Sequence, residues 1–220
     1  MNSKINKVNL TGWLVFLITL TVYFFSVERT GSLWDCGEFV LGAYKLQVVH
    51  PPGAPLFLII GRMFTWVADV LSDDPSKIAF AVNLMSGICS ALAATFICWV
   101  TIIFGKISLY GRGRDEEASQ DLGVMGAGLV AGLATAFATS VWFSAVEGEV
   151  YSMSTMFTTM TLWAAVKWYY LSNEPKNDRW LIFSLYSAGL SIGVHLLSLL
   201  AFPTIAILYY YKKWEKKSFL

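Results

Sequence analysis

The segment TGWLVFLITLTVYFFSVERTGSLWDCGEF, residues 11–39, decides the fold class, because a bilayer-length apolar run passes directly into a polar stretch. Residues 10–27 are long and apolar enough to form a membrane-spanning helix. The N-terminus is basic, but no small-residue cleavage pattern follows the run, so we interpret it as a retained span and not as a signal peptide. Asp35 and Glu38 lie just outside this span, and their purpose is the main question that the sequence raises.

The composition of the 220-residue chain excludes an ordinary soluble domain. Hydrophobic residues make up 56% of the chain and charged residues only 14%, and the mean hydropathy is +0.57. The three cysteines have no disulfide or metal spacing. The sequence also lacks a phosphate-binding glycine loop, a zinc motif, a serine-hydrolase motif and a basic surface for nucleic acid. We therefore predict an all-α, polytopic helical membrane protein with no nucleic-acid partner and no metal site.

The apolar pattern predicts about six transmembrane helices and a long first outer loop over residues 28–77. The run from 180 to 211 is too long for one span, so we divide it into two short spans that meet near His195. The predicted spans cover residues 10–27, 78–104, 122–141, 151–171, 180–195 and 196–211.

The outer loop contains a further apolar stretch, APLFLIIGRMFTWVADVL, which we do not assign as a span. Arg62 lies in its middle and Asp69 near its end, and a charge at the bilayer centre is costly. We predict an amphipathic helix that lies in the membrane interface.

Basic residues are concentrated at the two ends of the chain and in two loops, residues 106–114 and 176–179. The positive-inside rule places all four segments in the cytoplasm. The opposite side of the membrane then carries the polar residues Asp35, Glu38, His50, Glu147, Glu149 and His195. Because the sequence ends at KKSFL directly after a span, we expect it to be the N-terminal part of a longer protein.

Asp35 and Glu38 are three residues apart, so on a helix they share one face. A carboxylate at the membrane surface, partly shielded from water, can act as a general base with a raised pKa. The alternative is a helix N-cap aspartate followed by a glutamate in the first turn, which is electrostatically favourable at a helix start.

Four further residues are candidates for binding roles. Glu147 and Glu149 occupy a short turn between two spans, where acids mark functional sites, although a solvated turn also accepts glutamate. The HPPGAP segment restricts the backbone and can hold His50 beside the carboxylates, or it can serve only as a rigid turn. His195, between two short spans, is either a ligand contact or a satisfied polar group in a helix break.

Arg62 is a candidate for phosphate binding, because a guanidinium group binds phosphate through two hydrogen bonds. The alternative is that Arg62 extends along the interface to reach lipid headgroups.

The motifs LWDCGEF, HPPGAPLFLIIGRMF, AVEGEVYSMSTMF and GLSIGVHLLSLLAFP resemble those of C-type (GT-C) glycosyltransferases, which use polyprenyl-phosphate sugars. More specifically, the chain resembles bacterial relatives of the transmembrane protein O-mannosyltransferases along its whole length. This resemblance implies a GT-C-like fold, a polyprenyl-phosphate sugar as donor substrate, no other cofactor, and a protein or glycan as acceptor. It also implies location in a bacterial inner membrane, with the active site facing the periplasm.

The resemblance implies a role for each candidate residue. It makes Asp35 the catalytic base and places Glu38 beside it, although in related O-mannosyltransferases the second acid directly follows the first. Glu147 and Glu149 would line the same cavity. The residues His50, Arg62 and His195 would contact the donor.

A polyprenyl phosphate is a good leaving group, so transfer needs mainly a base for the acceptor hydroxyl and a cavity at the membrane edge. Displacement by one activated hydroxyl inverts the sugar's anomeric centre. The alternatives are a transporter or flippase for a lipid-linked sugar, which would place polar residues at mid-membrane, and a non-catalytic scaffold. The sequence specifies neither the sugar nor a metal requirement.

Overall fold

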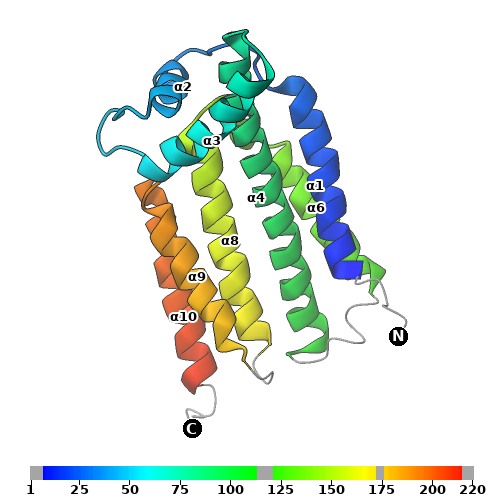
Figure 1. Cartoon of the computed structure of the whole chain (residues 1–220). Coiled ribbons are helices and arrows are strands. Elements are labelled where there is room, and N and C mark those ends of the chain that lie inside the picture. The colour runs from blue at the N-terminus through cyan, green and yellow to red at the C-terminus, as the bar shows by residue number, and fades with distance from the viewer. Residues whose placement is uncertain (1–6, 113–120, 172–175, 215–220) are drawn as a thin grey trace.

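The computed structural model describes residues 7–112, 121–171 and 176–214, and within these ranges the only regular structure is helical (Figure 1). The all-α prediction is confirmed for this part of the chain. The helices are α1 (Lys7–Ser26), α2 (Cys36–Lys45), α3 (Pro55–Leu71), α4 (Ser76–Tyr110), α6 (Leu122–Ala136), α7 (Thr139–Val146), α8 (Val150–Tyr170), α9 (Asp178–Ser191), the short 3₁₀ helix η1 (Leu196–Leu200) and α10 (Ala201–Trp214).

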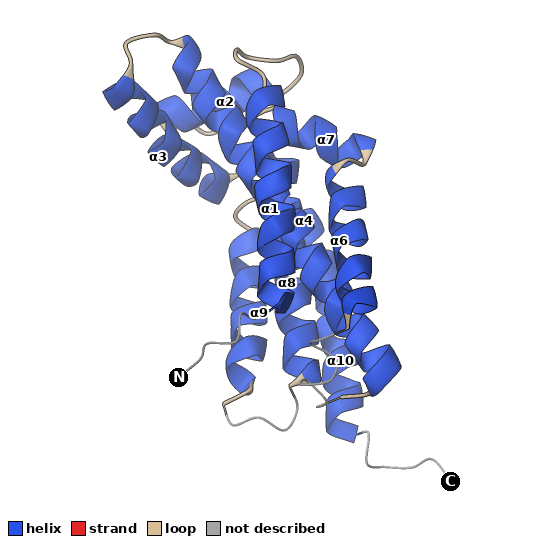
Figure 2. Ribbon diagram, turned by 90° about the vertical axis from the view of Figure 1, so that its right-hand side faces the viewer, coloured by secondary structure: helices blue, strands red, loops and turns tan. Residues whose placement is uncertain are grey.

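The long helices form a bundle, and α2, α3 and α7 lie at one end of it, as Figures 1 and 2 show. The opposite end holds the first residue of α1 and the last residues of α4, α8 and α10. Among the described residues, this end carries Lys7, Lys106, Lys176, Arg179 and Lys212. The predicted segregation of basic residues is therefore present, while Lys4, Arg114, Lys216 and Lys217 lie outside the described ranges.

Helix α4 is the central element of the bundle. It packs against α1, α6 and α8 along its length and against α3 and α7 near its first turns. Its 35 residues correspond to about 52 Å at 1.5 Å per residue, well beyond the ~30 Å of a hydrocarbon core. Close approach of α6 depends on glycine, because a Cβ on Gly128 would lie 2.5 Å from Cγ1 of Ile102.

Two helices, α1 and α4, are long and apolar enough to cross a membrane. The pair α6 and α7, bent by 62°, is a third if it forms one broken span. Helix α8 has 21 residues, whereas α9 and α10 have 14 each and are separated by a break that contains His195. Length and composition thus establish two or three spans, and the count of six stays a prediction.

The bend between α6 and α7 differs from the sequence expectation. We expected one helix over residues 122–141 followed by a short turn, but α6 ends at Ala136 and residues 139–146 form α7. The hydroxyl of Tyr23 on α1 donates a 2.6 Å hydrogen bond to the carbonyl of Ala136. This bond satisfies a carbonyl at the end of α6, where the helix itself supplies no partner.

A buried cluster fixes the outer loop onto the bundle. Phe39 of α2 and Phe57 of α3 pack with Val82 and Met85 of α4 and with Met153 of α8. These side chains are at most 4% exposed, so the loop is part of the folded core. The packing places Asp35, at the start of α2, over the first turn of α8.

Candidate functional site

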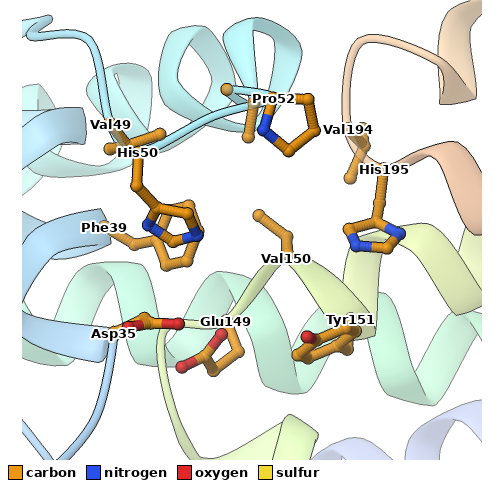
Figure 3. Close-up of a pocket in the computed structure, with 12 residues that line it drawn as sticks. Asp35, Phe39, Val49, His50, Pro52, Glu149, Val150, Tyr151, Val194 and His195 are labelled. Carbon is orange, nitrogen blue, oxygen red and sulfur yellow. The ribbon is translucent and has the colours of Figure 1, made fainter.

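A small open cavity lies at the end of the bundle that carries α2 and α3 (Figure 3). Its volume of about 40 Å³ would hold only one or two water molecules, so a sugar would have to bind at its open mouth. Four separate chain segments form the lining, which consists of Asp35, Phe39, Val49, His50, Pro52, Gly53, Ala54, Glu149, Val150, Tyr151, Val194 and His195.

Asp35 occupies the N-cap position of α2, but its side chain makes no capping hydrogen bond. The carboxylate is exposed and lies beside that of Glu149 in Figure 3. Asp35 thus stands at the N-cap position, as the second interpretation of the sequence predicted, but its side chain does not cap the helix. An exposed carboxylate without a capping role can accept a proton from a hydroxyl at the cavity mouth.

Glu38 and His50 form a pair. Nδ1 of His50 lies 2.7 Å from Oε2 of Glu38, and the backbone N–H of His50 donates to Oε1 at 2.7 Å. The hydrogen bonds that Glu38 accepts from His50 lower the pKa of Glu38, and the hydrogen bond from the His50 ring to this carboxylate raises the pKa of His50. The ion pair is lost as pH falls through the lowered pKa of Glu38 or rises through the raised pKa of His50, whereas the backbone hydrogen bond from His50 does not depend on the charge of the ring.

The turn that carries His50 is closed by a hydrogen bond from the N–H of Gly53 to the carbonyl of His50 at 2.9 Å. The segment is thus a closed turn, and it places His50 beside a carboxylate. That carboxylate belongs to Glu38.

Glu149 is the most perturbed acid at the cavity. Burial, followed by the nearby charges of Asp35 and Glu147, raises its pKa to about 7, and His50 partly opposes the shift. The folded protein therefore binds a proton at Glu149 more tightly than the unfolded chain does. The corresponding stability is complete below the ordinary pKa of glutamate and is lost as pH rises through about 7.

We expect infrared titration of the purified protein to show a protonated carboxyl band that disappears with a midpoint near pH 7. Glu149→Gln should remove this component. Asp35→Asn should lower its midpoint, because the charge of Asp35 contributes to the raised pKa. A band that titrates at the ordinary glutamate pKa, or one that survives in Glu149→Gln, would contradict the assignment.

A buried network joins the two acidic segments. The N–H of Gly148 donates to Sγ of Cys36 at 3.3 Å, and this thiol in turn donates to Oδ1 of Asn83 at 3.7 Å. The side-chain amide of Asn83, on α4, donates to the carbonyls of Glu28 at 2.9 Å and Thr30 at 3.1 Å. Asn83 is fully buried and thus fixes the residues next to Asp35 and Glu149 to one point on the bundle.

Gly148 cannot be enlarged without a shift in this network. A Cβ at this position would lie 3.0 Å from Cγ1 of Val82 and 3.1 Å from Oδ1 of Asn83. The glycine between the two glutamates therefore lets the turn approach α4 without displacing these neighbours.

His195 closes the far side of the cavity, at the break between α9 and η1. Its Nδ1 accepts a hydrogen bond from the N–H of Leu197 at 3.2 Å, which leaves Nε2 as the ring nitrogen available to a ligand. The ring lies 5.4 Å from that of Tyr151, at the start of α8. The N–H of Leu56 donates to the carbonyl of Gly193 at 2.8 Å and ties this break to α3.

The structure places Arg62 and Glu147 outside the cavity lining. Nη1 of Arg62 donates to the carbonyl of Tyr44 at 2.6 Å and lies 3.9 Å from Oδ2 of Asp69. Arg62 thus joins α3 to α2. Glu147 ends α7 and contributes to the cavity through its charge, which helps to raise the pKa of Glu149.

Asp35, Glu38 and His50 each offer one ligand atom, and these atoms lie within 4.8 Å of one another. A divalent cation has carboxylate and imidazole ligands available here. All three residues are exposed, however, and two of them already bond each other, so their geometry alone does not define a metal site.

Sequence reasoning missed three residues of the site: Cys36, Asn83 and Tyr151. Asn83 could have been identified from the sequence, because it is a polar amide within the apolar stretch IAFAVNLMSGI. A polar side chain inside a membrane span needs a hydrogen-bond partner. Cys36 and Tyr151 have ordinary sequence contexts, and only the folded arrangement shows their contacts.

The amino-acid sequence matches a known protein family and two curated proteins. Residues 35–218 match the family described as the protein O-mannosyl-transferase TMEM260 N-terminal domain. The chain is 25% identical over 167 residues to protein O-mannosyl-transferase tmem260 of Dictyostelium discoideum, which covers 76% of this chain and 18% of that protein. It is 23% identical over 178 residues to protein O-mannosyl-transferase TMEM260 of Mus musculus, with coverage of 81% and 22%. The chain thus spans about a fifth of the length of these curated relatives, and no solved structure matches it.

Proposed function

The chain belongs to the protein O-mannosyl-transferase TMEM260 N-terminal domain family, and from this premise we propose that it forms the membrane part of a glycosyltransferase. The proposed reaction moves a sugar such as mannose from a polyprenyl-phosphate donor to a hydroxyl of a protein or glycan acceptor. The relatives named as O-mannosyl-transferases support this reaction class. The observation that carries the proposal is an exposed Asp35 carboxylate at the mouth of a cavity at one end of an apolar bundle.

In the proposed mechanism Asp35 acts as the general base. Its carboxylate takes the proton of the acceptor hydroxyl while the hydroxyl oxygen forms a bond to the anomeric carbon. The bond from that carbon to the phosphate oxygen breaks, and the polyprenyl phosphate leaves with the electron pair. Because the hydroxyl attacks opposite the leaving phosphate, the anomeric configuration is inverted.

The residues around Asp35 have supporting roles in this proposal. His50 and His195, on two sides of the cavity, are the donors that we assign to the phosphate. Protonation of Glu149 near neutral pH reduces the negative charge that an anionic donor meets. Glu38 holds His50 in place through their hydrogen bonds, and this is a positioning role.

We propose that α3 lies in the interface on the cavity side of the membrane, as the sequence predicted. Ile59, Met63, Trp66 and Val70 are at least 56% exposed and recur at helical spacing, so α3 presents an apolar face outward. The six-span topology, the cytoplasmic location of both ends and a periplasm-facing site in a bacterial inner membrane belong to the same proposal.

The location of the cavity favours an enzyme over a transporter. A transporter for a lipid-linked sugar would be expected to hold its substrate near the bilayer midplane, between broken helices. Here the cavity lies at one end of the bundle, beside α2 and α3.

The proposal predicts that full-length protein in vesicles transfers labelled mannose from polyprenyl-phosphate mannose to a serine- or threonine-containing peptide. A β-linked donor should give an α-linked product, which nuclear magnetic resonance of the glycopeptide would show. Nucleotide-linked mannose should give no product. Movement of the lipid donor across the vesicle without peptide labelling would instead support the transporter.

A further inference from the structure

A second cavity lies among α8, α9 and α10. The last residues of α8 and α10 and the first residues of α9 lie at the end of the bundle opposite α2 and α3 (Figure 1). Its volume of about 490 Å³ is in the range of small-molecule sites. The lining combines aromatic, aliphatic and charged side chains, namely Trp168, Asp178, Leu181, Ile182, Tyr209, Lys212 and Lys213. None of these residues belongs to the acidic cavity.

The aromatic wall of this cavity is fixed by several contacts. Trp168 is 4% exposed, and its ring stacks on that of Tyr209 at 5.9 Å with an interplanar angle of 7°. Its indole N–H donates to Oδ1 of Asp178 at 3.1 Å, and the side-chain amide of Asn177 donates to its carbonyl at 2.8 Å. The wall is therefore preorganised before any ligand arrives.

Two lysines supply positive charge to the same cavity. The ammonium of Lys212 lies 3.8 Å from the centre of the Trp168 ring and donates to the Trp168 carbonyl at 2.5 Å. An ammonium has three N–H groups, so this bond leaves donors for a ligand. Lys213 lines the same cavity and is exposed. The charged residues of the lining are these two lysines and Asp178, so the lining carries one net positive charge. A phosphodiester monoanion would neutralise this charge.

The remaining wall is apolar and faces outward. Ile182 is 66% exposed, and Leu181 lies beside it on α9. A small inorganic anion would use only the ammonium groups and would leave this wall in contact with water. A molecule with an anionic head and a hydrocarbon tail would use both, and basic cavities between membrane helices on the cytoplasmic side are suited to such lipids.

We propose that this cavity binds the headgroup of an anionic phospholipid from the leaflet that faces the basic end of the bundle. The phosphate contacts Lys212 and Lys213, and the first acyl carbons lie along Leu181 and Ile182. This site is separate from the acidic cavity and does not depend on the transferase proposal.

Native mass spectrometry of the full-length protein in detergent, titrated with phosphatidylglycerol or phosphatidylcholine, tests the proposal. Phosphatidylglycerol should bind more tightly. The double variant Lys212→Gln, Lys213→Gln should weaken its binding about 25-fold, at about fivefold per lysine. Because Lys212 also bonds to Trp168, Lys213→Gln alone provides a second test that leaves this contact intact, with an expected loss of about fivefold.

The matched control is Lys176→Gln, Arg179→Gln, which removes two charges from the same end of the bundle but none from the cavity lining. It should change phosphatidylglycerol binding less than twofold. Equal losses in the two double variants would show general surface attraction and overturn the proposal. Equal binding of phosphatidylcholine, or displacement of the lipid by an equal concentration of glycerol phosphate, would also overturn it.

Discussion

Replacement of Asp35 by asparagine is expected to abolish sugar transfer by the full-length protein while leaving its accumulation in the membrane unchanged. The amide has almost the same shape but cannot accept the acceptor proton, and general-base catalysis contributes about 10²- to 10⁴-fold. Since Asp35 is exposed and makes no capping bond, its loss should not destabilise α2. Glycosylation of outer-compartment proteins, measured at matched membrane levels of the two forms, is the readout.

Asp73→Asn is the matched control for this experiment. Asp73 is also exposed, lies between α3 and α4 on the same side of the bundle, and is absent from the cavity lining. It should leave transfer unchanged. Glu38→Gln should reduce sugar transfer less than Asp35→Asn does, because it only weakens the hydrogen bonds that hold His50 in place. If glycosylation persists in Asp35→Asn, the base assignment fails and a scaffold or transport role gains support.

The second large effect is expected for Asn83→Ala. This change removes the donors to the Glu28 and Thr30 carbonyls and the acceptor of the Cys36 thiol. Unmade hydrogen bonds of part-buried groups cost about 1–3 kcal/mol, so the thermal midpoint should fall by several degrees. Transfer should fall at least tenfold even at temperatures where the variant stays folded, because Asp35 and Glu149 lose their common anchor.

Ser86→Ala provides the control for Asn83→Ala. Ser86 is one turn further along α4 and is buried to the same degree, but its hydroxyl has no hydrogen-bond partner among the described residues. It should lower neither stability nor transfer measurably. A purely structural role for Asn83 would lower the amount of folded protein without affecting the pKa of Glu149. The positioning role predicts that this pKa falls as Asp35 moves away.

The parts of the fold that depend on local sequence were predictable. Apolar runs of bilayer length identified α1 and α4 as candidate spans. A helix around Arg62 and Asp69 was also predicted and is present as α3, whereas its location in the membrane interface stays a prediction. The bend after Ala136 was not predictable, because residues 137–141 contain neither glycine nor proline and the bond from Tyr23 comes from 113 residues away.

The arrangement of the site was likewise predictable only in part. The predicted topology placed Asp35, Glu149, His50 and His195 on one side of the membrane, and the structure brings all four to one cavity. The sequence did not reveal that Glu38 pairs with His50 rather than facing the cavity, because that contact depends on how the 49–54 turn folds back onto α2. Arg62 was expected to contact the donor, but its hydrogen bond to Tyr44 arises from the packing of α3 on α2.

In the proposed reaction, the length of α4 would set the depth at which the donor and the acceptor meet. From Asn83, which anchors the acidic cavity, to Lys106, near the basic end, the helix rises about 35 Å, close to the ~30 Å of a hydrocarbon core. With the membrane orientation that we propose, the cavity would lie level with the phosphates of the bilayer surface. A lipid-linked sugar could present its phosphate there without leaving the membrane, so only the acceptor would have to travel to the reaction.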